Sequence, residues 1–375
     1  MRPASLIVLV HWLGCVVWAA PADALTIQFD YGCDGGFFTT APQADAARAA
    51  LEYAARNFGM FRDNLAAVEP SGPNEWKAYF TSPADGSEVE VVNAVLPAET
   101  VVIYAGGREL GDQVLGIGEA GGRWAQGTTE AWLNTVFYRG QAGAIPPEPT
   151  DFGPWGGSIV FDSSASWNFD VHNGPSAPEE NDFLSTALHE LCHVLGFATS
   201  DSWRTHVVSG SHEFVGPYSV AAFGGNVPLA LGDGHWQAGT ESTVGGAVQE
   251  AAMAPNLLVG DRKRLTVLDL AGMRDVGWDM PLPGDADHDG DIDSEDYLSL
   301  KAHLGGPGSW VDGDFDFDGD VDGDDLAAMQ ESFAESGGAS PAGLPSSAVP
   351  TPSAVTILLP GAAALIRRRR RGAGN

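Results

Sequence analysis

The order of apolar and polar positions predicts one large mixed domain between residues 25 and 280. Four short stretches, either alternating or continuously apolar, have the length and composition of β-strands: 25–31, 76–81, 101–104 and 157–161. After the first of them, an Ala- and Leu-rich stretch at about 43–67 has helical periodicity and ends before Pro70. The pattern therefore predicts an α+β domain that is long enough for one substantial core.

A second helix is predicted later in this domain, and it carries the most informative polar residues. Asn181 or Asp182 is a suitable N-cap, and the helix that follows has apolar flanks around His189, Glu190 and His193. Histidines four residues apart lie above one another on one helical face, so both imidazoles can reach one zinc ion. Glu190 lies between them in the sequence and projects beside the metal, where it can take a proton from bound water.

Composition further limits the classes of partner and ligand that the chain is expected to bind. The chain has 375 residues, and its 50 Asp and Glu against 19 Lys and Arg give a formal net charge of −31. Nucleic acid is therefore not expected as a partner, because phosphate binding needs a basic surface. Metal cations suit such a chain better. Three cysteines exclude a disulfide-dense scaffold.

Both ends of the chain have the features of export signals. A positive start, an apolar stretch and the small-x-small pattern at residues 22–24 predict a secretory signal peptide over 1–24. At the other end, a flexible linker rich in Gly, Ser, Pro and Ala at 336–352 precedes a short apolar run and five arginines within 353–375. We expect an exported protein, extracellular or associated with a bacterial cell envelope, with the last segment as a candidate anchor.

The region 281–335 contains a repeated acidic pattern. Fifteen of the 50 acidic residues fall between positions 285 and 325. Two loops, 285–296 and 314–325, have carboxylates at alternate positions, Gly at position 6 and a β-branched residue at position 8. A calcium loop requires this spacing, because six to eight oxygens must point into one tight turn. The predicted calcium ligands are Asp285, Asp287, Asp289, Asp291, Asp293, Asp296, Asp314, Asp316, Asp318, Asp320, Asp322 and Asp325.

The helix motif, extended by Gly196, resembles the metzincin zinc peptidases. In most of them the third zinc-binding histidine stands three residues after the Gly, where this chain has Thr199. A Gly-x-His-Trp segment that contains His235 resembles instead the leishmanolysin-like branch, in which an insertion separates the Gly from the third ligand. This resemblance implies His235 as the third zinc ligand, with His206 and His212 as alternatives.

The same branch gives expectations for the rest of the site. Residues 250–255 resemble its Met-turn, which implies Met253 as the floor beneath the metal, and 265–278 resemble its closing helix. The resemblance implies a metzincin-like domain, with a twisted sheet and an active-site helix, that hydrolyses a protein or peptide substrate with Glu190 as the catalytic base. In this family an extended peptide pairs with an edge strand, and 156–161 is the candidate here.

The acidic region and the tail carry two further resemblances. The two loops, each followed by a predicted helix at 297–304 or 326–333, resemble a type I dockerin, a small α-helical EF-hand-like module. Dockerins bind cohesin-bearing scaffold proteins, and a calcium-stiffened spacer is the alternative. The tail resembles a PEP-CTERM sorting signal, which an envelope sorting protease removes, although Thr351 stands where that signal has Glu.

Together these features favour an exported zinc endopeptidase with Zn²⁺ and Ca²⁺ as cofactors. The competing hypothesis is a non-catalytic envelope adhesin or scaffold component with a structural zinc site, in which Glu190 would have no use. Cys33 and Cys192 remain after the signal peptide is removed. Cys192 is expected to be buried on its helix, and Cys33 either pairs with it or stays free.

Overall fold

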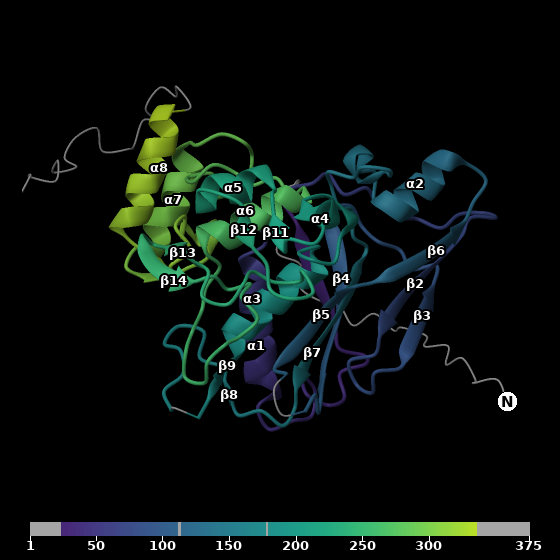
Figure 1. Ribbon diagram of the computed structural model, residues 1–375, viewed down its shortest axis with the longest axis horizontal. Helices are drawn as coiled ribbons and strands as arrows, with labels where there is room; N and C mark the ends of the chain where they lie inside the picture. The colour runs from purple at the N-terminus through teal and green to yellow at the C-terminus, as the bar shows by residue number, and fades with distance from the viewer. Residues whose placement is uncertain (1–23, 112–113, 178, 336–375) are drawn as a thin grey trace, which may run out of the picture.

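The computed structural model describes residues 24–335, apart from 112, 113 and 178, and these residues form a mixed α+β fold (Figure 1). The predicted signal peptide up to residue 23, the linker and the sorting segment lie outside the described residues. Within the described part of the chain, no helix is long and apolar enough to cross a membrane. All four predicted strands form, so the prediction of an α+β domain is confirmed.

The central sheet has the strand order β1-β4-β7-β5. Strands β1 (Thr26–Asp30), β4 (Thr100–Arg108) and β7 (Gly156–Asp162) are parallel, and β5 (Gly116–Ala120) runs antiparallel to β7. Because β7 pairs on both sides and is buried along its length, the prediction of 156–161 as the edge strand was wrong. Among the described strands, β5 is the edge strand at that side of the sheet.

Two helices pack together beneath the site. Helix α3 (Phe183–Val194) lies against β5 and β7, and α1 (Ala44–Arg56) packs on α3 (Figure 1). Helix α1 is shorter than predicted, because the Asn57 side chain donates hydrogen bonds to the carbonyl oxygens of Tyr53 and Ala54 and so ends the helix. Phenylalanines from several segments fill the interface between helices and sheet, namely Phe37, Phe38, Phe161 and Phe183.

A second, smaller sheet lies at one end of the molecule, on the right in Figure 1. Its strands β3 (Glu88–Val92), β2 (Glu75–Thr81) and β6 (Gly122–Gln126) are antiparallel, and α2 (Glu130–Tyr138) follows β6. It has its own buried cluster around Trp76 and Trp155. The fully buried Arg139 joins this part to the central sheet, because its guanidinium donates to backbone carbonyls of residues 66, 97, 100 and 154.

The chain between α3 and the acidic region forms short elements around the end of α3, and helix α6 closes this part against the core. These elements are α4 (Asp201–Thr205), β10 (Val207–Val208), β11 (Glu213–Phe214), α5 (Pro217–Phe223), β12 (Val227–Pro228), β13 (Glu241–Val244), β14 (Ala247–Glu250) and α6 (Val267–Val276). Two short strands that pair with each other, β8 (Trp167–Asn168) and β9 (Asn181–Asp182), precede α3.

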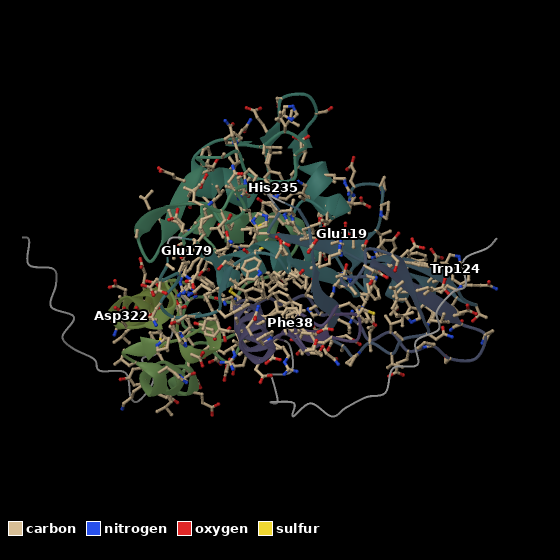
Figure 2. The ribbon with its side chains drawn as sticks, turned by 90° about the horizontal axis from the view of Figure 1, so that it is seen from below. Phe38, Glu119, Trp124, Glu179, His235 and Asp322 are labelled. Carbon is tan, nitrogen blue, oxygen red and sulfur yellow. The ribbon has the colours of Figure 1, made fainter. Side chains whose placement is uncertain are left out.

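The acidic region forms a compact module at the opposite end from the small sheet. Its helices α7 (Ser294–His303) and α8 (Gly323–Glu335) each begin three residues earlier than predicted. Short strands β15 (Gly306–Pro307) and β16 (Asp320–Val321) pair with each other. Figure 2 shows Asp322 of this module and Trp124 of the small sheet at opposite ends, with Phe38 in the core between them.

Candidate metal centre

Helix α3 starts where the sequence predicts and is held at its start by a buried ion pair. The Asp182 carboxylate accepts a hydrogen bond from the Ser185 N–H at 2.7 Å, which makes Asp182 the N-cap. Arg262 pairs with the other carboxylate oxygen at 2.7 Å. The turn after the helix contains Gly196, whose φ of +110° is in the region that favours glycine. Both ends of α3 are therefore fixed.

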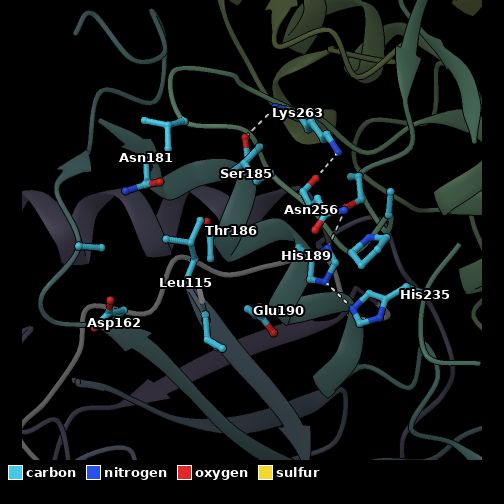
Figure 3. A pocket seen from close by; sticks show the side chains of 18 of the residues that line it. Leu115, Asp162, Asn181, Ser185, Thr186, His189, Glu190, His235, Asn256 and Lys263 are labelled. Carbon is cyan, nitrogen blue, oxygen red and sulfur yellow. Dashed lines mark hydrogen bonds between the residues drawn. The ribbon is translucent and has the colours of Figure 1, made fainter. Parts of the chain in front are cut away.

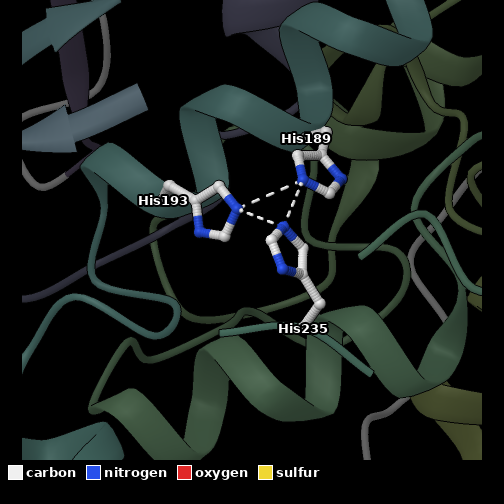
Figure 4. A group of neighbouring side chains, drawn as sticks. All are labelled: His189, His193 and His235. Carbon is white, nitrogen blue, oxygen red and sulfur yellow. Dashed lines mark hydrogen bonds between the residues drawn. The ribbon is translucent and has the colours of Figure 1, made fainter. Parts of the chain in front are cut away.

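Three imidazoles meet at one point beside α3. The Nε2 atoms of His189, His193 and His235 lie 3.1 Å from one another, as Figure 4 shows. His189 and His193 come from adjacent turns of α3, and His235 comes from the loop after β12. The two alternative histidines lie elsewhere: His212 pairs with Asp233 at 2.7 Å, and His206 packs against Phe214.

The hydrogen bonds of two of the rings fix their tautomer. Nδ1 of His189 lies 2.8 Å from the Ala252 carbonyl oxygen, and Nδ1 of His193 lies 3.0 Å from that of Phe197. Because a carbonyl oxygen only accepts, each Nδ1 carries the proton and each Nε2 turns a lone pair toward the shared centre. Burial also lowers the pKa of all three imidazoles, that of His193 to about 4, which keeps them neutral.

This arrangement fits a tetrahedral metal ion. Lone pairs that face one another at 3.1 Å repel unless a cation lies between them. Nitrogens bound tetrahedrally to zinc at 2.0–2.1 Å are about 3.3 Å apart, close to the observed separation. Three neutral imidazoles are also a donor set that zinc accepts in catalytic sites, where a fourth position stays open.

Glu190 lies beside the three histidines without joining their group. Its side chain is buried, and burial raises its pKa to about 8, against the opposing effect of a backbone hydrogen bond from Gly118. Figure 3 shows Glu190 in the same pocket as His189 and His235. A carboxyl group in this position can accept a proton from a water molecule at the metal and later release it.

The pocket is an open cavity of about 660 Å³ between β5 and the chain that follows Met253. Leu115, directly before β5, and Asn256 lie on opposite sides of it, with α3 between them (Figure 3). Gly116 and Pro255 also line the pocket. Lys263 also lines the pocket, with its ammonium bound to the Glu250 carboxylate and the Asn256 carbonyl oxygen. The cavity is large enough for side chains of a peptide.

Helix α3 approaches β5 more closely than a side chain would permit. A β-carbon at position 118 would overlap the Glu190 carbonyl oxygen, and one at position 116 would lie 2.8 Å from Cγ of Glu190. The sequence Gly116-Ile117-Gly118 therefore allows the edge strand to lie directly on the helix that carries Glu190. This strand was not predicted from the sequence, although two glycines that flank one β-branched residue are a signal for close backbone approach.

One buried carboxylate, that of Asp269 on α6, organises the region beneath the histidines. It accepts hydrogen bonds from the N–H groups of Ala252 and Met253 and from the indole Nε1 of Trp236. Met253 is fully buried, and its carbonyl oxygen accepts from the Trp236 N–H. Asp269 thus holds both the turn at Met253 and the residue next to His235. No motif in the sequence indicates this role of Asp269.

The two acidic loops each bring carboxylates together. Asp285, Asp287 and Asp289 form one group, and Asp314, Asp316 and Asp325 form the other. The Oδ1 atoms of Asp285 and Asp314, at position 1 of each loop, are buried and have no hydrogen-bond partner. Such carboxylates are costly to bury unless a cation compensates them, so the loops fit calcium.

The other predicted calcium ligands lie outside these two groups. One of them, Asp296, stands at position 12, as Asp325 of the second group does. Both carboxylates close their loops by accepting hydrogen bonds from backbone N–H groups, those of residues 286, 287 and 293 in the first loop and of 315, 316 and 322 in the second. Besides Asp296, five predicted ligands belong to neither group: Asp291, Asp293, Asp318, Asp320 and Asp322. Cys33 and Cys192 are free thiols, and Cys192 is buried as expected.

Comparison with known proteins adds no relative. No protein-family model, curated protein or solved structure matches this chain.

Proposed function

We propose that this chain is an exported zinc-dependent endopeptidase of the metzincin type. The observation that carries the proposal is the convergence of three neutral imidazole nitrogens at 3.1 Å, with the unliganded Glu190 carboxyl beside them in an open pocket. A purely structural zinc site is closed by four protein ligands and needs no adjacent carboxyl. This contrast favours hydrolysis over the alternative of a non-catalytic adhesin or scaffold component.

Each residue of the site would have one role in the reaction. His189, His193 and His235 would hold the ion, which when bound supplies a Lewis acid and a water of lowered pKa. Glu190 would take the proton of the attacking water and pass it to the leaving amine. The raised pKa of its buried carboxyl, about 8, suits a group that must both accept and release a proton near neutral pH.

The edge strand β5 supports a peptide as substrate. Its first residue, Gly116, lines the pocket together with Leu115, and the strand has no neighbour on its outer side among the described residues. An extended chain can add to such an edge through main-chain hydrogen bonds, which recognise a backbone rather than a particular side chain. We therefore propose cleavage within extended segments of protein substrates.

Exchange of Glu190 tests this proposal. The Glu190→Gln variant should keep one zinc ion per chain and the thermal stability of the wild type, yet lose peptide cleavage by at least about 100-fold. Zinc content and hydrolysis of a denatured protein would be measured on both proteins. Glu52→Gln, an exposed change on α1, is the matched control and should keep full activity. Undiminished cleavage by Glu190→Gln would refute the mechanism.

We propose in addition that residues 281–335 bind two calcium ions in a dockerin-like manner. The buried, unpartnered Oδ1 atoms of Asp285 and Asp314 carry this second proposal. Calcium titration by calorimetry should show about two ions per chain, and Asp285→Asn with Asp314→Asn should remove both. Binding to a cohesin-bearing scaffold and processing of the tail by a sorting protease remain hypotheses that the sequence resemblance implies.

A further inference from the structure

An arginine of the large domain meets the first calcium loop. The guanidinium of Arg62 donates a hydrogen bond to Oδ2 of Asp285 at 3.1 Å. Gly290, at position 6 of the loop, faces the same guanidinium, because a β-carbon there would lie 3.7 Å from NH1 of Arg62. Arg62 itself is fixed by backbone hydrogen bonds in both directions with Asp279, directly after α6. The first loop is therefore attached to the core of the large domain.

A second arginine meets the second loop at the equivalent position. The guanidinium of Arg264 covers Gly319, at position 6 of that loop, so closely that a β-carbon on Gly319 would overlap it. Gly290 and Gly319 have φ of +96° and +91°, which the sharp bend of a calcium loop requires. The two loops thus present the same face to the large domain, and each receives one arginine there.

The second loop also contacts the hairpin β13–β14. At the tip of the hairpin, the Gly245 N–H donates to the Asp316 carbonyl oxygen at 3.2 Å. On β14, the Gln249 side chain exchanges two hydrogen bonds with the backbone of Arg264, at 2.7 and 3.1 Å. Strand β14 ends at Glu250 and leads directly into the turn at Met253. Two separate contacts therefore connect this loop to the segment beneath the three histidines.

Apolar side chains are also buried where the module meets the large domain. Trp310, Phe315 and Met329 of the module belong to the same buried cluster as the core of the large domain. The Tyr53 hydroxyl on α1 donates to the Gly308 carbonyl oxygen of the module at 2.9 Å. Figure 1 shows β13 and β14 next to the module at the end of the molecule that α7 and α8 occupy. The module is thus packed on the large domain.

We infer that the calcium module has the peptidase domain of the same chain as its partner, and that calcium binding to its loops stabilises the Met253 turn beneath the histidines. The inference rests on the proposed function, since it needs calcium in the loops. Its physical basis is that Asp316 offers its carboxylate to the ion and its carbonyl oxygen to Gly245. An ion that fixes the loop therefore also fixes the tip of the hairpin, and Gln249 and Arg264 fix its second strand.

Hydrogen exchange of the full chain tests the inference. Zinc-loaded protein is titrated with calcium in metal-depleted buffer without a chelator, and calcium uptake is measured in parallel by calorimetry. In the wild type, calcium should slow amide exchange in residues 241–254 by about tenfold or more. In the Arg62→Gln, Arg264→Gln double variant, calcium uptake should persist, because removal of nearby cations does not weaken carboxylate ligands. The slowing should then be lost in residues 247–254, which the arginines connect to the loops, and should remain only at the hairpin tip, where Gly245 keeps its bond to Asp316.

Two further variants keep the test decisive. Single Arg264→Gln leaves the first loop untouched and should lose most of the slowing in 247–254, even where the double variant fails to fold. Arg204→Gln is the matched control, because Arg204 pairs with Asp201 and contacts neither loop, and it should respond as the wild type does. A full calcium response in Arg264→Gln would overturn the inference.

The outcomes separate this inference from the proposals on which it rests. Calcium uptake by the wild type without any change in 241–254 overturns the coupling alone. No calcium uptake overturns the coupling and the calcium proposal together. Protein that shows calcium-dependent slowing but cleaves no peptide supports the coupling and removes the peptidase proposal.

Discussion

Asp269 illustrates how a single side chain determines the geometry of a site that it does not enter. Its carboxylate joins Trp236, Ala252 and Met253, from two loops, to helix α6. Groups that orient metal ligands from behind commonly change metal affinity by 10–100-fold when they are replaced. The position of His235 and the carbonyl oxygen of Ala252 that orients His189 both depend on Asp269.

We predict that Asp269→Asn weakens zinc binding by about tenfold or more, because an amide replaces one acceptor oxygen with a donor. Zinc release to a chromophoric chelator measures the change. Asp275→Asn is the matched control on the same helix, since Asp275 is also buried but accepts from Tyr218 and Ser219 on α5. It should lower thermal stability without changing zinc affinity. Equal zinc affinities in all three proteins would contradict the prediction.

A second prediction at this scale concerns Asp63, far from the loops. Burial raises its pKa to about 10, with further contributions from Asp151, Glu99 and Asp279. Between pH 4 and 10 the folded chain therefore holds a proton that the unfolded chain has lost, and the free energy of unfolding falls as pH rises. Asp63→Asn has no proton to retain. It should raise the melting temperature by a few degrees at pH 8.5 and by less at pH 5.

Thermal melts of wild type and variant at the two pH values test this expectation. The exposed change Asp45→Asn on α1 serves as control and should leave both melting temperatures unchanged. An identical effect of Asp63→Asn on the melting temperature at pH 5 and pH 8.5 would show that a proton held by Asp63 does not contribute to the pH dependence of stability.

At the scale of elements, the sequence predicted best those segments whose local signals agree with their surroundings. Helix α3 has a capping aspartate at its start, a long apolar stretch and a glycine in the turn that follows, and it forms where predicted. Strand β5 was not predicted because its sequence, GIGEA, contains two glycines and a Glu, which are uncommon in β-strands. Only the packing of α3 shows why glycine is required there.

The close contact between β5 and α3 yields a prediction for this pair of elements. Gly118→Ala would place a methyl group on the Glu190 carbonyl oxygen, so the strand must move away from the helix. We expect kcat/KM to fall by about tenfold or more and stability to fall by about 1–3 kcal/mol. Gly122→Ala on β6 is the control, because its β-carbon would meet the nearest atom, Cβ of Tyr79, at an ordinary 3.6 Å. Steady-state kinetics and thermal melts would distinguish them.

At the scale of the whole molecule, the sequence indicated the parts but not their contacts. The spacing of His189, Glu190 and His193 and the two acidic loops could be read from the sequence, because each motif is local. His235 could be predicted as a ligand only through a family resemblance. It lies 42 residues from His193, and the sequence around a single histidine does not indicate which other residues it will meet. The docking of the module could not be predicted, because it depends on the isolated residues Arg62 and Arg264.

The module should respond to calcium as a unit in the full chain. Without calcium, repulsion among the carboxylates of both loops should open residues 284–325 to an added protease, and calcium should protect them. Limited proteolysis with fragment masses measures this. Asp285→Asn should abolish protection of the first loop, whereas Asp291→Asn, at a position where the backbone carbonyl is the expected ligand, should preserve it. Cleavage outside 284–325 as the first event, with and without calcium, would contradict the prediction.

The edge of β5 that no other described strand covers also bears on contacts between copies of this protein. Among the described residues no strand covers this edge, so it can pair with an extended segment, including a loop from a neighbouring copy, which the proposed peptidase activity would then cleave. The formal charge of −31 opposes such encounters, because like-charged molecules repel at low ionic strength. Salt screens this repulsion over about 10 Å at 0.1 M, so self-digestion would be slowest in dilute salt and would increase as ionic strength rises.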